Sequence, residues 1–510
     1  MDEYVVEMRH ITKRFPGVVA NDDVTIQIRP GEVYALLGEN GAGKSTMMSM
    51  LFGMYEPDDG QIIVRGEEVH FRSSNDATAH NIGMVHQEFK LVSNFTVAEN
   101  IVMGSEPMTK HLGFLPGVDM KRANEEIAEL SKRYGLEVNP TDVIEDLPVS
   151  VRQRVEILKM LYREADILIF DEPTAVLTPQ EIDSLLDIID ELRNSGKTII
   201  LITHKIEEIR RIADRCAILR RGKLVGVYDV DSISAQEMAN LMVGREVQLT
   251  TQKPEAHYRD TVLEVEHLTV RNENKFEVVK DVSFKIRGGE IFAIAGVSGN
   301  GQGELADAIS GMKDVYSGTI RLNGTDITHA SVRERVEDGM SYIPEDRQGV
   351  GLFLDLSLAQ NLALRRYYKE PFAKNGILQF NEFDTYADRL IEEYDVRSGQ
   401  GGKTTVRSMS GGNQQKAIVA REIEEHAPLS IFVQPTRGMD IGAIENIHNA
   451  ILEERDNGVA ILLISLELDE IMELADTIGV IFGGELLKIA DASTMTSQEV
   501  GKYMMGVKEA

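Results

Sequence analysis

The stretch VYALLGENGAGKST, residues 33–46, decides the fold of the first half of the chain. A short apolar run, VYALL, leads into the glycine-rich turn GENGAGKST at residues 38–46, and an apolar helical pattern follows. Backbone N–H groups in such a turn can cradle phosphates at the N-terminus of the helix. The side chain of Lys44 can reach the β- and γ-phosphates, and the hydroxyl of Ser45 can bind Mg²⁺. The stretch therefore predicts a strand, a turn and a helix that hold ATP and Mg²⁺.

The same arrangement recurs in the second half, where IFAIAGVSGNGQGE occupies residues 291–304. Other segments repeat in the same order: residues 5–15 match residues 262–272, and residues 53–69 match residues 311–327. In both halves, short apolar runs alternate with helical patterns, which is typical of a parallel sheet covered on both faces. We therefore predict an α/β protein with two tandem copies of one domain.

The polar stretch at residues 245–260 has neither helical nor strand periodicity and is predicted to link the copies, at residues 1–244 and 261–510. A chain of 510 residues is long enough for two or more domains. No apolar run approaches the ~18–20 residues that a membrane-spanning helix needs. The N-terminus, MDEYVVEMRHITKRF, lacks the basic and apolar regions of a secretory signal. We expect a cytoplasmic protein unless a partner holds it at a membrane.

The chain carries a formal net charge of −29, from 54 Lys and Arg against 83 Asp and Glu residues. Binding to phosphate backbones needs clustered cations, so this balance argues against nucleic acid as a partner and is explained more simply by solubility. The single cysteine, Cys216, excludes internal disulfides and a cysteine-rich metal site. Its neighbours in ADRCAILR predict an inert, buried residue.

The segment ILIFDEPT, residues 167–174, is an apolar strand that ends in two adjacent carboxylates. Unpaired charge at a buried strand end is costly. We therefore expect Asp171 to bind Mg²⁺, and Glu172 is placed to polarise the attacking water. His204 ends the strand pattern ILIT. A lone histidine there is more often structural, but after a phosphate loop and a carboxylate strand it is expected to sense the γ-phosphate.

Two further residues are candidates for the same site. Gln87, in GMVHQEF, would be a surface amide in isolation. In this order of motifs it is expected to contact Mg²⁺ and the water, and to report the nucleotide state to a partner. Phe15 is a candidate for stacking on the adenine ring, with an ordinary core role as the alternative.

These motifs resemble those of the ATP-binding-cassette (ABC) family over nearly the whole chain. GENGAGKST is similar to the family's Walker A motif, HQE at residues 86–88 to its Q-loop, ILIFDEPT to its Walker B motif and His204 to its switch histidine. SGGN at residues 410–413 is similar to its signature. The resemblance implies two P-loop NTPase cassettes, each with a mostly parallel sheet core, an antiparallel β subdomain and a helical insert.

In that family, two cassettes pair head to tail, and each ATP lies between one Walker A motif and the opposite signature. The residues that the resemblance implies for nucleotide are Phe15, Gly38, Glu39, Asn40, Gly41, Ala42, Gly43, Lys44, Ser45, Thr46, Ser410, Gly411, Gly412 and Asn413. Those implied for Mg²⁺ are Ser45, Gln87 and Asp171, and those implied for catalysis are Glu172, His204 and Gln87.

Head-to-tail pairing would form two sites, each from the Walker A motif of one half and the signature of the other. Under that pairing, every replaced motif residue falls in one of these two sites. The first site joins residues 38–46 to residues 410–413 and is complete, whereas the second would join residues 296–304 to residues 147–153. In the phosphate loop of the second site, Gln302 replaces the lysine, Gly303 replaces the residue with the Mg²⁺-binding hydroxyl, and Glu304 adds an acid. Val433 and Gln434 replace the two carboxylates, and Leu466 replaces the histidine. Pro148, Val149 and Ser150 replace the Ser-Gly-Gly of the signature. The chain is expected to hydrolyse ATP at the first site alone.

The fused cassettes, with SGGNQQK and PTRGMD in the second half, resemble the ATPase subunits of simple-sugar and nucleoside importers, and residues 82–104 resemble the nucleoside branch. This implies an ATPase at the cytoplasmic face of the cell membrane that drives nucleoside uptake, with a monosaccharide as the alternative. Its implied partners are two permease subunits and an extracytoplasmic solute-binding protein. A soluble ABC protein that acts on ribosomes or DNA is disfavoured by the short linker and the single cysteine. A non-hydrolysing scaffold is disfavoured by the intact first site.

Overall fold

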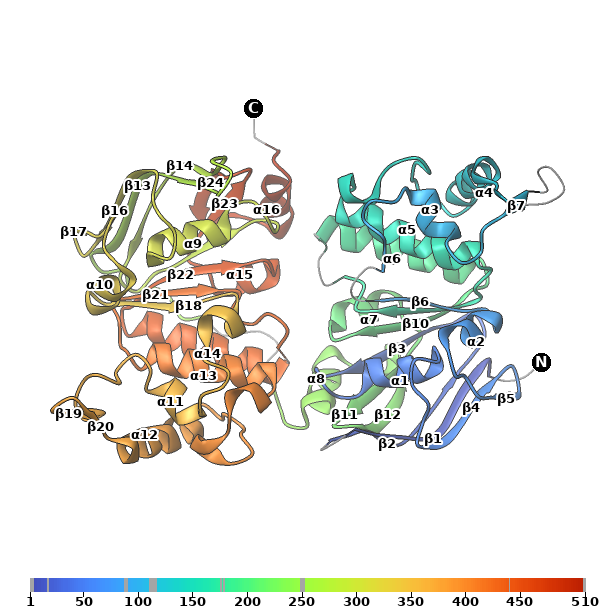
Figure 1. The fold of residues 1–510 in the computed structure, drawn as a ribbon, viewed down its shortest axis with the longest axis horizontal. Coiled ribbons are helices and arrows are strands. Elements are labelled where there is room, and N and C mark those ends of the chain that lie inside the picture. Colours follow the sequence, from blue (N-terminus) through green and yellow to red (C-terminus); the bar gives the residue numbers. More distant parts are fainter. Residues whose placement is uncertain are drawn as a thin grey trace. The chain divides into compact units, whose positions relative to one another are not determined.

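The computed structural model describes residues 4–15, 18–86, 90–109, 117–174, 177, 179–247, 253–439 and 441–507. The chain divides into two compact units, Met1–Val247 and Gln248–Ala510. We call them cassette 1 and cassette 2, and both are drawn in Figure 1. The same types of element follow in the same order in each, as the sequence repeat predicts.

The centre of each cassette is a six-stranded sheet, with equivalent strand orders of β12-β11-β3-β10-β9-β6 and β24-β23-β15-β22-β21-β18. Neighbouring strands are parallel except at one edge, where β12 pairs with β11 and β24 pairs with β23 in antiparallel fashion. In cassette 1 the strands are β3 (Val33–Gly38), β6 (Ile82–Val85), β9 (Ile167–Asp171), β10 (Thr198–Thr203), β11 (Arg215–Arg220) and β12 (Lys223–Asp229). In cassette 2 they are β15 (Ile291–Ala295), β18 (Met340–Ile343), β21 (Leu429–Val433), β22 (Ala460–Ser465), β23 (Thr477–Phe482) and β24 (Glu485–Asp491).

A four-stranded antiparallel sheet accompanies each large sheet, in the orders β2-β1-β4-β5 and β14-β13-β16-β17. Buried and exposed residues alternate along these strands, because one face packs on the core and the other meets water. The strands are β1 (Val6–Phe15), β2 (Val18–Ile28), β4 (Asp59–Val64), β5 (Glu67–Val69), β13 (Thr261–Arg271), β14 (Glu277–Arg287), β16 (Ser317–Leu322) and β17 (Thr325–Asp326). Two short hairpins join β7 (Met108–Thr109) to β8 (Gly117–Val118) and β19 (Ala373–Lys374) to β20 (Ile377–Leu378).

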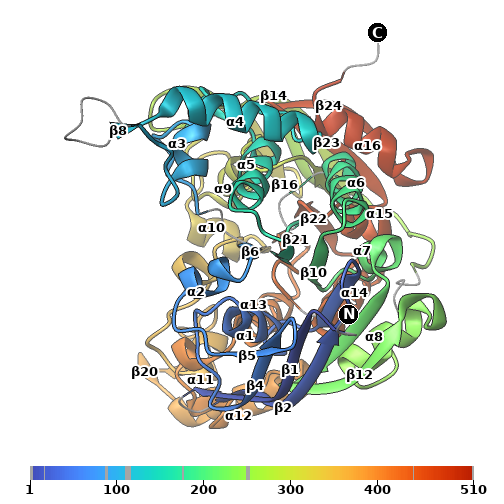
Figure 2. The same cartoon turned by 90° about the vertical axis from the view of Figure 1, so that its right-hand side faces the viewer.

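Helices cover the large sheets, and three helices in each cassette form an insert. In cassette 1 the helices are α1 (Lys44–Leu51), α2 (Ser74–Ala79), the insert α3 (Val97–Val102), α4 (Met120–Arg133) and α5 (Val149–Tyr162), then α6 (Pro179–Asn194), α7 (Ile206–Ile212) and α8 (Ala235–Val243). In cassette 2 they are α9 (Gln302–Ser310), α10 (Val332–Glu337), the insert α11 (Leu358–Leu362), α12 (Phe380–Glu393) and α13 (Gly411–Ile423), then α14 (Ile441–Asp456), α15 (Leu468–Leu474) and α16 (Ser497–Met504). Figure 2 shows α4, α5 and α6 on one side of the large sheet of cassette 1 and β1, β2 and β4 on the other.

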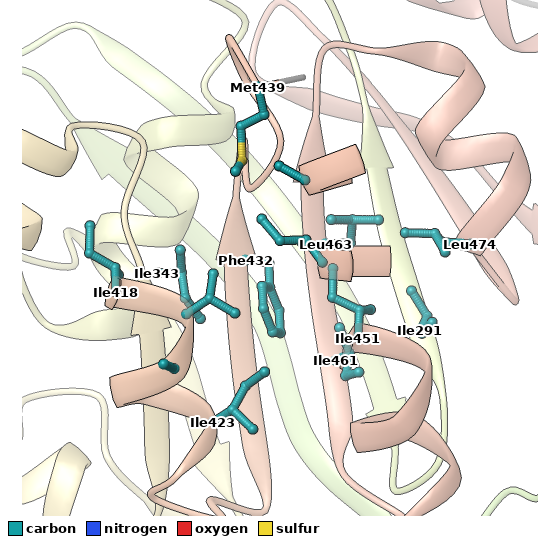
Figure 3. Packing of buried hydrophobic residues seen from close by; sticks show 14 of the residues in the cluster. Ile291, Ile343, Ile418, Ile423, Phe432, Met439, Ile451, Ile461, Leu463 and Leu474 are labelled. Atoms are coloured by element: carbon teal, nitrogen blue, oxygen red, sulfur yellow. The ribbon is translucent and has the colours of Figure 1, made fainter. Parts of the chain in front are cut away.

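Alternate residues of one strand belong to two different cores. Ile200 and Ile202 of β10 pack into a cluster with α1 and the antiparallel sheet, whereas Ile199 and Leu201 pack into a cluster with α3, α4, α5 and α6. Cassette 2 repeats this division. Figure 3 shows one of its clusters, in which Phe432 lies among apolar side chains of neighbouring strands and helices. Burying each such side chain contributes about 1.5–3 kcal/mol, so the sheet that carries the site is held rigidly from both faces.

The predicted α/β fold of two tandem cassettes is confirmed, each with a mostly parallel core, an antiparallel sheet and a helical insert. Cys216 is fully buried on β11, as predicted, and burial raises the pKa of its thiol to about 11, which disfavours the reactive thiolate. The chain divides after Val247, and beyond the break Pro254 accepts a hydrogen bond from the buried Arg455 of cassette 2. Within the ranges that the structure describes, no helix has the length and apolar character needed to cross a membrane.

Candidate functional site

The glycine-rich turn of cassette 1 connects the fully buried strand β3 to α1. Gly43, the residue before the helix, has φ 98°, and a Cβ there would lie 2.2 Å from the carbonyl oxygen of Ala20. Gly41 has φ 77°, but a Cβ there would meet nothing within 4 Å. The turn thus needs glycine for tight packing at Gly43, while Gly41 borders open space. The first N–H groups of α1 have no partner inside the helix and face a site suited to an anion.

Lys44, the first residue of α1, is only 5% exposed. Its Nζ donates hydrogen bonds to the carbonyl oxygens of Gly38 at 2.7 Å and Glu39 at 3.0 Å. Burial lowers the pKa of Lys44, and the nearby carboxylates of Glu172 and Asp171 act against that shift. The ammonium is therefore folded back over the turn, close to the carboxylates that end β9.

Ser45 and Asp171 come together from elements 126 residues apart, because β3 and β9 both flank β10. The exposed Ser45 hydroxyl donates to Asp171 Oδ1 at 3.1 Å. Burial raises the pKa of Asp171 to about 6, and the charge of Glu172 adds to that rise. A hydroxyl beside a buried carboxylate of raised pKa is a donor set that a hard divalent cation would stabilise.

Ser45 and Asp171 provide few of the ligands that a metal ion needs. No cluster of three or more His, Cys, Asp and Glu side chains able to hold a metal occurs in the described part of the chain. Mg²⁺ usually takes one or two carboxylates and completes its coordination with water and the phosphates of a nucleotide. Ser45 and Asp171 therefore fit Mg²⁺ that arrives with ATP better than a permanently bound metal.

Glu172 follows Asp171 and lies 3.3 Å, through Oε1, from Nδ1 of His204. The residue has φ 48°, and its backbone N–H donates to the carbonyl oxygen of Ile202 on β10. Burial acts to raise the pKa of Glu172, but the hydrogen bond and charge of His204 and the charge of Lys44 outweigh it, so the pKa is lowered. The two adjacent carboxyl groups therefore have pKa values pushed apart, which is the pattern of groups with different chemical roles.

Four other residues expected at this site lie in the same turn or at the start of the helix that follows it. Thr46 is in the first turn of α1, and Glu39, Asn40 and Ala42 are in the loop itself. Phe15, at the end of β1, is half-buried and meets Tyr55 edge to face, with ring centroids 5.5 Å apart. Tyr55 was not among the residues that the sequence suggested for this site. Gln87 lies outside the described residues.

Cassette 2 keeps the backbone of this site while its chemistry differs. Gly301 has φ 98°, as Gly43 does, and Gln302 is 5% exposed, as Lys44 is. The Gln302 amide nitrogen donates to the carbonyl oxygen of Val297 at 2.9 Å, so a neutral amide replaces the ammonium. Gln434 has φ 52°, close to that of Glu172, but the group that reaches its Oε1 is the backbone N–H of Leu466, at 3.4 Å. The second turn has retained the shape of the first without its charges.

The signature residues lie at the N-terminus of α13 in cassette 2. Ser410 is the residue before the helix, and its Oγ accepts a hydrogen bond from the side-chain nitrogen of Asn413 at 2.8 Å. Gly411 begins the helix, and a Cβ on Gly412 would meet nothing within 4 Å. The helix therefore presents an open N-terminal turn that suits an anion. In cassette 1 the equivalent helix, α5, begins after Pro148.

Sequence analysis missed a buried carboxyl group behind each site. Glu208 accepts hydrogen bonds from Thr174 at 2.5 Å and from Thr203 at 2.9 Å, which ties the end of β10 to the segment after β9. Thr436 and Glu470 repeat the first of these bonds in cassette 2, at 2.8 Å and with the same separation of 34 residues. That repeated spacing was the available signal.

Comparisons with known proteins place these observations in a family. A model of the ABC transporter family matches residues 21–175 and 279–437. The chain is 49% identical over 505 residues to the nucleoside import ATP-binding protein NupA of Lactococcus lactis, covering 99% of each chain. It is 50% identical over 504 residues to the guanosine import ATP-binding protein NupO of Bacillus subtilis, covering 99% of this chain and 98% of the relative.

A glucose import ATP-binding protein of Haloferax volcanii, TsgD13, is 40% identical over 534 residues, covering 100% of this chain and 97% of the relative. The two matched segments of the family model correspond to the two cassettes, each with its own strand, turn and helix. The chain belongs to the ABC transporter family, as an ATPase of the import type with two cassettes.

Proposed function

We propose that this protein hydrolyses ATP to power the import of a nucleoside. The observation that carries the proposal is the Lys44, Asp171, Glu172 and His204 cluster of cassette 1, set in a chain about half identical to nucleoside import proteins. The more distant 40% identity to a glucose import protein makes a monosaccharide the second candidate. The charge of −29 fits a protein with no nucleic-acid partner.

In this proposal each residue of the cassette 1 site has a role that suits its position. The N–H groups of residues 38–46 and the ammonium of Lys44 hold the phosphates, and Ser45, Asp171 and Gln87 hold Mg²⁺. Bound Mg²⁺ would neutralise charge on the phosphates. Glu172, whose pKa is lowered, stays ionised and polarises the attacking water.

The remaining groups orient those that react. His204 contacts Glu172 Oε1 through Nδ1, a position from which it orients that carboxylate and senses the γ-phosphate. Phe15 and the adjacent Tyr55 form an aromatic edge for the adenine ring. Gln87 reports the nucleotide state to a partner.

We further propose that residues 1–244 and 261–510 pair head to tail, with residues 245–260 between them. The turn of cassette 1 and residues 410–413 of cassette 2 then form the working site. The second pairing would set Gln302, Gly303 and Glu304 against Pro148 and the residues after it, and it would not hydrolyse ATP. All replaced motif residues fall in the second pairing and none falls in the first, which supports this arrangement.

The proposed partners are two membrane permeases and an extracytoplasmic solute-binding protein, with this chain on the cytoplasmic face of the membrane. The segment that follows β6 is proposed to receive a permease. Phe95 is 38% exposed there, which suits a docking residue, whereas Leu91 packs partly against the core of cassette 1.

Uptake by cells tests the proposal. In a strain of the source organism that lacks this gene, uptake of labelled guanosine, adenosine, ribose, galactose and glucose would be compared before and after return of the wild-type gene or Glu172→Gln. Nucleoside uptake is expected to fall and to return with the wild-type gene only. Loss of sugar uptake with normal nucleoside uptake would favour the second candidate and overturn the first.

A further inference from the structure

Arg347 of cassette 2 joins two segments that lie far apart in the sequence. It follows β18 and is half-buried. Its Nη1 donates a hydrogen bond to the carbonyl oxygen of Gly411, 64 residues away, at 2.9 Å. Its Nη2 donates to the carbonyl oxygen of Arg437, 90 residues away, at 3.2 Å. One guanidinium thus bridges the first residue of α13 and the loop that follows β21.

The surrounding groups fix this bridge in place. The carboxylate of Asp346 accepts hydrogen bonds from the backbone N–H groups of Gln348 and Gly349, which holds the turn that carries Arg347. Glu345 forms an ion pair with Arg437. The three consecutive residues at 345–347 therefore bind the loop after β21 and the N-terminus of α13 as one unit.

The guanidinium of Arg347 lies beside the N-terminus of α13, where a positive charge is ordinarily unfavourable. The N-terminus of an α-helix carries partial positive charge, so a guanidinium beside Gly411 is repelled by it. Within the described ranges, Arg347 forms no ion pair with a carboxylate, while Arg437 is neutralised by Glu345. The charge of Arg347 and the partial positive charge of the helix N-terminus therefore lie together beside Gly411, and an anion placed at this open turn would be attracted by both.

The sequence of cassette 1 lacks the arginine that makes this bridge. Counted from the ends of β6 and β18, the position of Arg347 is occupied by Phe89, and counted from the ends of β9 and β21, that of Arg437 is occupied by Ala175. Phenylalanine has no side-chain donor and cannot make the two hydrogen bonds of Arg347, and alanine cannot form the ion pair that Arg437 forms with Glu345. The arginine bridge therefore occurs in the cassette that has Ser-Gly-Gly at the start of the helix and is absent from the sequence of the cassette that has lost it.

We propose that Arg347 is a positioning residue for ATP hydrolysis. It holds the N-terminal turn of α13 against the loop after β21 and adds positive charge where the γ-phosphate of ATP binds. This inference rests on the proposed function, because it needs residues 410–413 to complete the site of cassette 1. A role in holding the fold alone would affect ATP and ADP alike, whereas a role at the γ-phosphate affects ATP only.

The test uses the full transporter complex and the variant Arg347→Met, which keeps the apolar part of the side chain. We expect kcat/KM for ATP to fall about tenfold to hundredfold, the range spanned by losing a hydrogen bond from a charged group. In a Glu172→Gln background, where turnover is blocked, the Kd for ATP should rise by a similar factor while the Kd for ADP changes less than about twofold, the scale of ordinary surface changes. Arg333→Met, at an exposed ion pair on α10, is the matched control and should change neither.

Wild-type kcat/KM in Arg347→Met, or equal weakening of ATP and ADP, would overturn the inference. If Arg347→Met does not fold, Arg347→Lys carries the same test, because one ammonium cannot bridge both carbonyl oxygens as the fork does. Gly412→Asp in the same complex distinguishes an error about the role of Arg347 from an error about the proposed head-to-tail pairing. If Gly412→Asp abolishes turnover and the Arg347 variants do not, only the role of Arg347 is wrong. If Gly412→Asp is also harmless, the proposed pairing is wrong.

Discussion

The carboxylate of Glu172 lies 3.3 Å from Nδ1 of His204, and the equivalent residues 32 positions apart in cassette 2 are Gln434 and Leu466. The backbone is similar at Glu172 and Gln434, with φ of 48° and 52° and with each N–H donating to a carbonyl oxygen of the neighbouring strand. The clear difference at this point is in the side chains, and its effect can be measured by substitution.

Glu172→Gln is expected to lower ATP turnover by at least ~10²-fold, because the side chain that polarises water is lost. The neutral amide should leave ATP bound. Steady-state ATPase activity and retention of labelled ATP in the purified complex measure both effects. Gln434→Ala and Leu466→Ala are the matched changes in cassette 2 and should keep turnover within about twofold. The opposite result, with loss in Gln434→Ala and none in Glu172→Gln, would reverse the assignment of the two sites.

Asp171→Asn should stabilise the nucleotide-free protein, and more at pH 8 than at pH 5. The folded pKa of Asp171, about 6, lies above the ordinary value of 3.8. The folded state therefore binds the proton more tightly, and the contribution of Asp171 to stability falls as the pH rises from about 4 through 6 and is constant above about 7. Removing the group should raise the free energy of unfolding by about 1–3 kcal/mol at pH 8 and by about 1 kcal/mol less at pH 5.

Denaturant unfolding of both proteins at the two pH values measures this difference. Added Mg²⁺-ATP should remove the advantage of Asp171→Asn, because the wild-type carboxylate then has a cation to bind. A gain of the same size at both pH values would show that burial of the Asp171 charge is not its source.

Gly412→Asp should abolish ATP turnover without loss of stability. A Cβ at Gly412 meets nothing within 4 Å, so the cassette can accept the new side chain. In the proposed pairing, its carboxylate would face the γ-phosphate, where like charges repel. Ser150→Asp, the matched change in cassette 1, should be tolerated because that helix would face a turn without lysine. Equal sensitivity of the two variants in the purified complex would argue against head-to-tail pairing.

Phe95 and Leu91 should behave differently when replaced by alanine. Leu91 packs against the core of cassette 1, so Leu91→Ala should lower the melting temperature, with a loss below the ~2–5 kcal/mol of a fully buried leucine. Phe95 is 38% exposed, so Phe95→Ala should leave the melting temperature nearly unchanged but reduce co-purification with membranes and uptake. Normal assembly and uptake with Phe95→Ala would exclude it as a docking residue. Phe89, a further apolar residue of this segment, lies outside the described residues.

Much of the fold and the positions of the site residues could be predicted because each motif is contiguous. A glycine-rich turn between a strand and a helix, and a strand that ends in two acids, each have a local physical meaning. The repeat then predicted the second cassette from the first. The paired pKa values of Asp171 and Glu172 could not be predicted, since they depend on which charged groups burial brings near each carboxyl group.

Contacts between segments that lie far apart in the sequence could not be predicted either. The bridge from Arg347 to Gly411 and Arg437 joins positions 64 and 90 residues apart, and no pattern along one chain indicates such a contact. Glu208 is an exception, because its spacing from Thr174 recurs at Thr436 and Glu470. A repeated sequence thus carries some tertiary information, since equal spacing in both copies marks a shared contact.

Vanadate-induced photocleavage of the transporter complex tests the central claim most directly, because vanadate replaces the γ-phosphate and light breaks the backbone beside it. The proposed site predicts cleavage in residues 38–46 of cassette 1 and near Ser410 of cassette 2, identified by mass spectrometry of the fragments. It predicts none in residues 296–304 or near Pro148. Cleavage at residues 38–46 together with Pro148, or at residues 296–304, would contradict a single working site shared by the two cassettes.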